Sequence, residues 1–128
     1  MHIADVAFCD SQSSANARLF AVAISARVDI YKLSQPEENP EFEEDSLKPR
    51  QQLFKFDDTT TAINFRQDGQ LLLAGEKTGR IQLFELNNKF VLRQYTSFSN
   101  RINCMTFDQS NQKFLACANE TSIKYFDI

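Results

Sequence analysis

Short runs in which apolar and polar residues alternate follow one another along most of this chain. A run such as Ile81–Leu83 is typical of a β-strand with one buried face. Other runs are almost entirely apolar, and these favour strands covered on both faces: Leu19–Ala23, Leu71–Gly75 and Phe114–Ala118. Turn-forming pairs such as Asp68-Gly69 separate the runs. The pattern predicts an all-β protein.

Two segments of 22 residues repeat one another without a gap. Phe65–Leu86 overlays Phe107–Ile128, so the period is 107 − 65 = 42 residues. The matched pairs include Phe65 with Phe107, Leu73 with Leu115, Ala74 with Ala116, Ile81 with Ile123, and Phe84 with Phe126. An internal repeat of this length indicates one structural unit that is used several times.

A third copy lies near the N-terminus. Leu19–Leu33 overlays Leu72–Leu86 without a gap, and upstream Val6–Phe8 matches Ile63–Phe65. The overlay pairs Ala21 with Ala74, Arg27 with Arg80, Val28 with Ile81, and Tyr31 with Phe84. The distance from Phe8 to Phe65 is 57 residues, 15 more than 42. We assign the extra residues to two loop insertions, one at Ser11–Ala17 and one after Leu33.

Each unit is completed by a fourth strand, which we expect at Gln51–Phe56 and at Phe90–Thr96. Four strands in about 40–45 residues is the size of one β-propeller blade. We expect blade 1 at about 1–56, blade 2 at about 57–96 and blade 3 at about 97–128. No strand follows Ile128, so the third blade is expected to lack its fourth strand.

These residues resemble the WD40-repeat family. Ala74–Leu86 stands where that family has its Ser-Gly-x-x-Asp-Gly-x-Ile-x-x-Trp-Asp pattern, and Phe126-Asp127 stands at its Trp-Asp position. The chain lacks the Gly-His pair, and Tyr31, Phe84 and Phe126 replace Trp. The resemblance implies a WD40-type propeller of which this chain holds about three blades of a larger, seven-bladed ring. Because the family's buried polar network is incomplete here, we expect apolar packing to hold the blades together.

A narrower resemblance is to the U3 small nucleolar RNA-associated WD-repeat proteins of the small-subunit processome. It rests on Phe65–Gly75 followed by Gly79, with Arg27–Tyr31 and Leu92–Tyr95 alongside. It implies a non-catalytic scaffold in 18S ribosomal RNA maturation in the nucleolus, with neighbouring proteins and RNA as partners. The alternative is a WD40 adaptor of another assembly, such as a ubiquitin-ligase substrate receptor.

Three blades do not close a ring, since propellers have four to eight. An open piece leaves a sheet face and a sheet edge exposed. We therefore expect this chain to be part of a longer protein or to be completed by another chain.

An acidic, proline-containing stretch at Ser34–Pro49 holds all three prolines of the chain. We expect a loop there, because proline and dense like charge disfavour a sheet strand. It is either a solvated linker or a docking loop for a basic partner. The candidate docking residues are Glu37, Glu38, Glu41, Phe42, Glu43, Glu44 and Asp45.

The turns between second and third strands share one face of a propeller with the links between blades. The basic residues expected there are Arg27, Lys77, Arg80 and Arg101. They are either solvated turn charges or a rim that contacts a protein or RNA, since binding residues commonly lie on loops of a rigid scaffold. The net charge of −3 and pI near 5.1 oppose strong nonspecific nucleic-acid binding but leave room for such a patch.

Residue types that support other functions are sparse. Cys9, Cys104 and Cys117 form no Cys-x-x-Cys pair, and we expect reduced, buried thiols in an intracellular protein. With His2 as the single histidine, we expect no metal and no cofactor. The N-terminus has no signal-peptide pattern, and no apolar run approaches the roughly 18 residues of a membrane span.

Gly75–Arg80 has a superficial likeness to a phosphate-binding loop. Its glycines are one residue too close, Arg80 stands in place of lysine, and a strand is expected to follow instead of a helix. We interpret it as a corner between two strands. The carboxylates Asp57-Asp58 lie at a turn, where acids are common. We therefore expect no enzyme activity and no small-molecule substrate.

Overall fold

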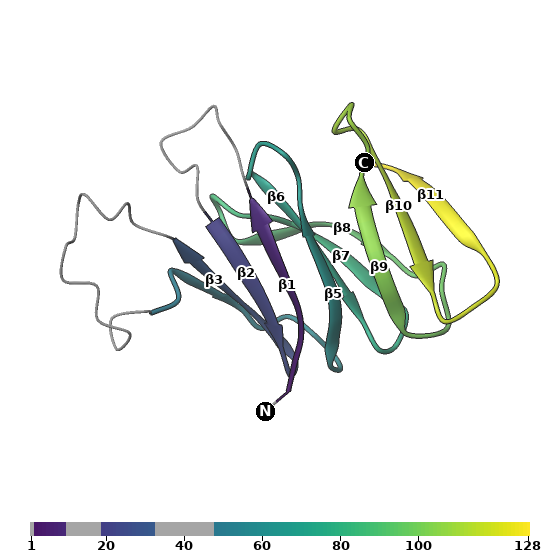
Figure 1. Ribbon diagram of the computed structural model, residues 1–128, viewed down its shortest axis with the longest axis horizontal. Coiled ribbons are helices and arrows are strands. Elements are labelled where there is room, and N and C mark those ends of the chain that lie inside the picture. The colour runs from purple at the N-terminus through teal and green to yellow at the C-terminus, as the bar shows by residue number, and fades with distance from the viewer. Residues whose placement is uncertain (1, 10–18, 33–47) are drawn as a thin grey trace.

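Three antiparallel sheets follow one another along the chain in the computed structural model, which describes residues 2–9, 19–32 and 48–128 (Figure 1). The first sheet contains β1 (Ile3–Cys9), β2 (Leu19–Ile24), β3 (Arg27–Lys32) and β4 (Gln51–Leu53). The middle sheet contains β5 (Thr60–Phe65), β6 (Leu71–Glu76), β7 (Ile81–Glu85) and β8 (Phe90–Tyr95). The third sheet contains β9 (Ile102–Phe107), β10 (Lys113–Ala118) and β11 (Ile123–Asp127). The predicted all-β fold, a partial propeller, is confirmed.

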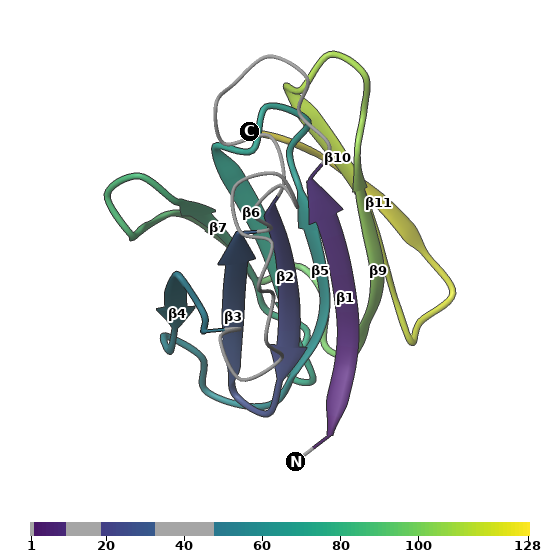
Figure 2. The same ribbon diagram turned by 60° about the vertical axis from the view of Figure 1, so that its left-hand side comes forward.

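The first strand of each sheet lies at a common inner edge. Figures 1 and 2 both show β1, β5 and β9 side by side, and β5 contacts both of the others. From this edge the sheets fan outward. We call the face that a sheet turns toward the preceding sheet its leading face, and the opposite face its trailing face. For the first sheet, the leading face is the one turned away from the middle sheet.

Two apolar joints hold the sheets together. The first joint packs the trailing face of the first sheet on the leading face of the middle sheet, with Ala21, Ile30, Leu72 and Phe84 among its buried residues. The second joint packs the middle sheet on the third. Its buried residues include Leu73, Ile81, Leu83, Ile102, Phe114 and Ala116. The middle sheet is covered on both faces, and every residue of β6 is buried.

The 42-residue period is reproduced in the pairing of the strands. Leu73 lies opposite Leu83 in the middle sheet, and Leu115 lies opposite Tyr125 in the third. The turn before β6 is also preserved, because Gly69 has a φ of 74° and Asn111 a φ of 60°. Glycine and asparagine are the residues that adopt this left-handed conformation most readily.

The gapless overlay of the first copy is wrong by one residue. Ala21 pairs with Ile30 as Leu73 pairs with Leu83, so Ala21 takes the place of Leu73 and not of Ala74. The reason is the hairpin turn. Two residues, Ser25 and Ala26, separate the paired Ile24 and Arg27, whereas the middle sheet uses three, 77–79. Side chains of a strand alternate between its two faces, so a shift of one residue places every side chain of β2 on the face opposite to the one that the gapless overlay predicts.

The expectation that all three apolar runs are covered on both faces is correct only for β6. Residues of β10 alternate between exposed and buried, since its trailing face is uncovered by the described residues.

The expectation that all three cysteines are buried also needs correction. Cys9 is buried, but Cys104 is exposed and Cys117 half-buried, with their Sγ atoms 2.6 Å apart across β9 and β10. Within the described ranges no helix has the length and apolar character of a membrane span.

Candidate partner-binding rim

Turns and links from all three sheets meet along the edge from which β1, β5 and β9 start. We call this edge the turn rim and define it as residues 25–27, 54–59, 77–80, 97–101 and 119–122. Backbone hydrogen bonds join its segments: Thr60 N–H donates to the Ser25 carbonyl at 2.8 Å, Lys77 N–H to Thr59 at 2.9 Å, and Asn119 N–H to Arg101 at 2.8 Å. The rim is therefore one continuous surface held by main-chain contacts.

Gly79 brings the middle hairpin against the link to the third sheet. A Cβ atom at this position would lie 2.5 Å from the Phe98 carbonyl oxygen and 2.8 Å from that of Asn100. Its φ of 96° is also one that other residues rarely adopt. On the other side of the same link, Ser99 N–H donates to Glu120 at 2.7 Å, and this bond is the main reason why the pKa of Glu120 is lowered.

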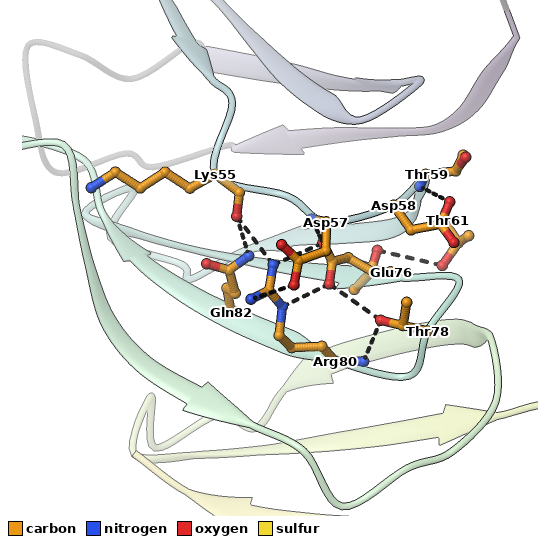
Figure 3. A network of polar contacts seen from close by, with 10 residues as sticks. Lys55, Asp57, Asp58, Thr59, Thr61, Glu76, Thr78, Arg80 and Gln82 are labelled. Carbon is orange, nitrogen blue, oxygen red and sulfur yellow. Dashed lines mark hydrogen bonds and ion pairs between the residues drawn. The ribbon is translucent and has the colours of Figure 1, made fainter.

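Arg80 is committed to a buried ion pair (Figure 3). Its Nε and Nη2 atoms donate to the two carboxylate oxygens of Glu76, at 2.7 and 3.0 Å, and the Glu76 side chain is fully buried. Asp57 adds a second, exposed carboxylate 3.2 Å from Nη1. The hydrogen bonds to Glu76 raise the pKa of Arg80 further, so it is charged at every relevant pH.

The same network ties the link between sheets to the middle hairpin. The Glu76 carboxylate accepts the Asp57 N–H at 2.7 Å, while the Lys55 carbonyl accepts Gln82 Nε2 at 2.6 Å (Figure 3). Thus the middle sheet does have a buried polar network, and the expectation of mainly apolar packing is incomplete. Sequence reasoning missed Glu76 and Gln82. The sequence did contain a signal for the ion pair: Glu76 ends an apolar run, and Arg80 follows it by four residues across the expected hairpin.

Arg27 is also paired. Its Nε atom donates to both carboxylate oxygens of Asp29, at 3.1 and 3.2 Å, and Gln52 Nε2 donates to the same carboxylate at 3.2 Å. Asp29 is buried, so this pair belongs to the leading face of the first sheet as much as to the rim.

Lys77 and Arg101 are the remaining members of the expected basic rim. Both are exposed, and within the described part of the chain neither forms an ion pair. Acidic groups accompany them on the rim at Asp57, Asp58 and Glu120. Lys55, on the link at 54–59, is a third exposed cation of the rim without an ion pair among the described residues. The rim is therefore a surface of mixed charge and not a basic stripe.

The candidate acidic loop cannot be placed on this surface. Its candidate residues lie outside the described residues: Glu37, Glu38, Glu41, Phe42, Glu43, Glu44 and Asp45.

The interpretation of Gly75–Arg80 as a corner between two strands is confirmed, because β6 ends at Glu76 and a strand, β7, begins at Ile81. Among the described residues no three His, Cys, Asp or Glu side chains group together as a metal site.

Comparison with known proteins places these sheets in a family. The family model described as the anaphase-promoting complex subunit 4 WD40 domain matches residues 46–110, half of the chain.

Among these relatives is U3 small nucleolar RNA-associated protein 15 of Schizosaccharomyces pombe, 32% identical over 110 residues, covering 85% of this chain and 20% of the relative. Its Mus musculus homolog is 38% identical over 71 residues, covering 55% and 11%. Pre-mRNA-processing factor 19 of Dictyostelium discoideum is 29% identical over 68 residues, covering 53% and 13%. The chain thus spans a fifth or less of the length of these relatives.

Proposed function

Because this chain belongs to the WD40-repeat family, we propose that it is a non-catalytic scaffold segment of a ribonucleoprotein assembly. The assembly proposed is the U3 small nucleolar ribonucleoprotein, or small-subunit processome, in the nucleolus. The observation that carries this proposal is the similarity to U3 small nucleolar RNA-associated protein 15 over 85% of the chain.

The proposed mechanism is rigid display of the turn rim. Main-chain hydrogen bonds and the Glu76–Arg80 pair fix the rim segments, so little conformational entropy is lost when a partner binds. Of the four basic residues predicted for the rim, Lys77 and Arg101 are then the two that are free to contact an acidic protein surface or an RNA phosphate. Arg27 and Arg80 contribute through the shape of the rim, because their charges are already paired. The acidic residues Glu37–Asp45 remain a predicted docking loop for a basic partner.

A pull-down of the tagged chain from nuclear extract tests the proposal. U3 small nucleolar RNA, measured by quantitative reverse transcription, is expected to be enriched together with processome proteins. The double variant K77E/R101E is expected to lower this recovery several-fold. Lys89→Glu is the matched control, since Lys89 is exposed in the β7–β8 turn at the opposite edge of the sheet.

The competing function is an adaptor in a different assembly, and the match to the anaphase-promoting complex subunit 4 WD40 domain favours it. Recovery of a cullin-type ligase or of anaphase-promoting complex subunits, with no U3 RNA, would replace the first proposal by this one. Turnover of a substrate that is lost when Asp57 and Asp58 are changed would contradict both.

A further inference from the structure

The two links that join the sheets follow the 42-residue period in their contacts. In the first link the Lys55 carbonyl accepts a hydrogen bond from Gln82 Nε2 at 2.6 Å, and in the second the Ser97 carbonyl accepts one from Lys124 Nζ at 2.6 Å. The aromatic pairs that follow these carbonyls keep the same period: Phe56 with Phe84, and Phe98 with Phe126. The two links can therefore be compared position by position.

The links differ in the side chains that they expose. Phe54 is 61% exposed and Lys55 is also exposed, whereas the second link has Thr96 and Ser97 at these positions. Thr96 is itself exposed, although the middle sheet that it follows is covered on both faces. The exposure of Phe54 therefore belongs to this position of the repeat and does not depend on the uncovered face of the first sheet.

Phe54 and Lys55 are held on a fixed turn. The Phe56 N–H donates to the Phe54 carbonyl at 2.8 Å, and Arg80 Nη2 joins Gln82 as a donor to the Lys55 carbonyl, at 3.3 Å. Figure 3 shows the Lys55 carbonyl turned toward this network and the ammonium group pointing away from it. An aromatic ring and a cation are thus displayed from a backbone that loses little conformational entropy when a ligand binds.

Electrostatic attraction at this turn is weak, because the charges around it balance. Three cations and three carboxylates lie here: Lys55, Lys77, Arg80, Asp57, Asp58 and Glu76. A polyanion therefore gains little from charge alone, and a peptide of acidic residues has no planar group to place on the phenyl ring. Every nucleotide of a single strand has such a group, because an unpaired base stacks on an aromatic side chain.

We propose that Phe54 and Lys55 form a contact for one nucleotide of single-stranded RNA. The base stacks on the Phe54 ring, and the Lys55 ammonium group pairs with an adjacent phosphate. The inference rests on the proposed function, since it specifies which residues of the turn rim touch RNA in the assembly. It adds an exposed aromatic residue to a rim that was predicted from its basic residues alone.

Fluorescence anisotropy with the chain and a short labelled oligouridine, which forms no duplex, tests the proposal at low salt. Phe54→Ala is expected to weaken binding about 5- to 150-fold, the range for one base stacked on an aromatic ring. Phe54→Tyr keeps a ring and is expected to bind like the parent. Lys55→Gln is expected to reduce the slope of log K against log salt by about 0.7, the value for one phosphate contact on a single strand.

Lys89 and Phe90 provide the matched control. They are also an exposed lysine beside an exposed phenylalanine, but they lie at the β7–β8 turn and the start of β8, at the opposite edge of the sheet. Phe90→Ala and Lys89→Gln are expected to leave oligouridine binding unchanged. Circular dichroism and urea unfolding check that every variant is folded.

Unlabelled competitors decide the class of ligand. Oligouridine is expected to displace the probe, whereas duplex RNA and oligoglutamate are expected to compete poorly. Binding that F54A leaves intact, or that F90A weakens equally, would overturn the proposal. Equal competition by oligoglutamate would overturn it in favour of an acidic protein partner.

The two proposals can fail separately. Oligouridine binding that depends on Phe54, together with a pull-down that lacks U3 RNA, would support the nucleotide contact and contradict only the assignment to the processome. A pull-down enriched in U3 RNA, together with oligouridine binding that does not depend on Phe54, would overturn the nucleotide contact and leave the scaffold proposal standing.

Discussion

The middle and third sheets have the same strand register but differ in what covers them. Leu73 and Leu115 occupy the same position in β6 and β10, yet Leu73 is fully buried and Leu115 is 41% exposed. The middle hairpin encloses the Glu76–Arg80 pair, whereas the third has Ala118 and Ser122 at these places. The contribution of a repeat position to folding stability therefore depends more on its neighbours across a joint than on its place in the strand.

Removing the cation of the buried pair is expected to have the largest effect. Arg80→Ala leaves the Glu76 carboxylate buried without a counter-charge, and such a loss costs about 3–5 kcal/mol. Ser122→Ala, at the equivalent place in the third sheet, is expected to change the unfolding free energy by less than about 0.5 kcal/mol. Urea unfolding measures both.

The double variant E76L/R80L separates charge burial from packing. Replacing both partners by apolar residues is often neutral, so most of the loss in R80A is expected to be recovered. A double variant as unstable as R80A would mean that the bond from the Asp57 N–H to Glu76, and not the unpaired charge, carries the stability.

Truncation of the equivalent leucines tests the comparison directly. Leu73→Ala leaves a cavity in the second joint and is expected to lower the unfolding free energy by about 2–5 kcal/mol. Leu115→Ala is expected to cost under about 1 kcal/mol. Equal losses at the two positions would show that β10 is covered in solution.

The glycine of β6 offers a steric version of the same test. An added Cβ at Gly75 would lie 2.6 Å from Cγ2 of Ile102, so Gly75→Ala is expected to destabilise by about 1–3 kcal/mol through overpacking. Cys117, at the equivalent position of the third sheet, already has a Cβ atom, and Cys117→Ala is expected to have little effect because the described residues leave that face uncovered. Adding Ile102→Ala to G75A relieves the contact, and the melting temperature of the double variant reports whether the two changes are coupled.

The smallest expected effect concerns the turns before β6 and β10. Burial opposes ionisation of Asp68, but hydrogen bonds from Arg66 and the Gln70 N–H lower its pKa overall. The pKa of Asp108 is lowered instead by the hydroxyls of Ser110 and Tyr125. Since a lowered folded pKa favours the ionised form, the contribution of Asp68 is complete above about pH 4 and is lost as the pH falls through the folded pKa.

Titration by nuclear magnetic resonance measures both carboxyls. Asp68→Asn is expected to lower stability at neutral pH by under about 1 kcal/mol, and by nothing below the folded pKa. Added salt is expected to raise the pKa of Asp68 more than that of Asp108, because only Asp68 has a cationic partner.

Strand positions and turn chemistry were predictable because they depend on local order along the chain. The alternating and apolar runs predicted β6, β7, β10 and β11, and a Gly or Asn at the left-handed position marked the turns. The hairpin of the first sheet was not predictable in the same way. Two overlays one residue apart both match apolar residues in Leu19–Ala23, and only the pairing of Ala21 with Ile30 decides between them.

The rim was predicted as a set of turns but not as a pattern of charge. Its segments follow from the order of strands in a blade, which the repeat reveals. Whether each cation forms an ion pair depends on its contacts with other segments, and the order of strands does not reveal those contacts. Arg80 meets Glu76 across a hairpin and Asp57 from the link between the first two sheets, whereas Lys77, three residues earlier, meets no carboxylate in the described structure.

The sequence by itself determined the period, the strands and the fold, because hydrophobic alternation and turn residues act over a few residues. The tertiary structure alone decided which faces are covered, which arginines are paired and that Cys104 is exposed beside Cys117. Those properties arise from contacts between sheets, where the same residue type at the same repeat position meets a different neighbour. Burial and charge pairing are therefore set by the joints, and the joints exist only once the sheets have packed.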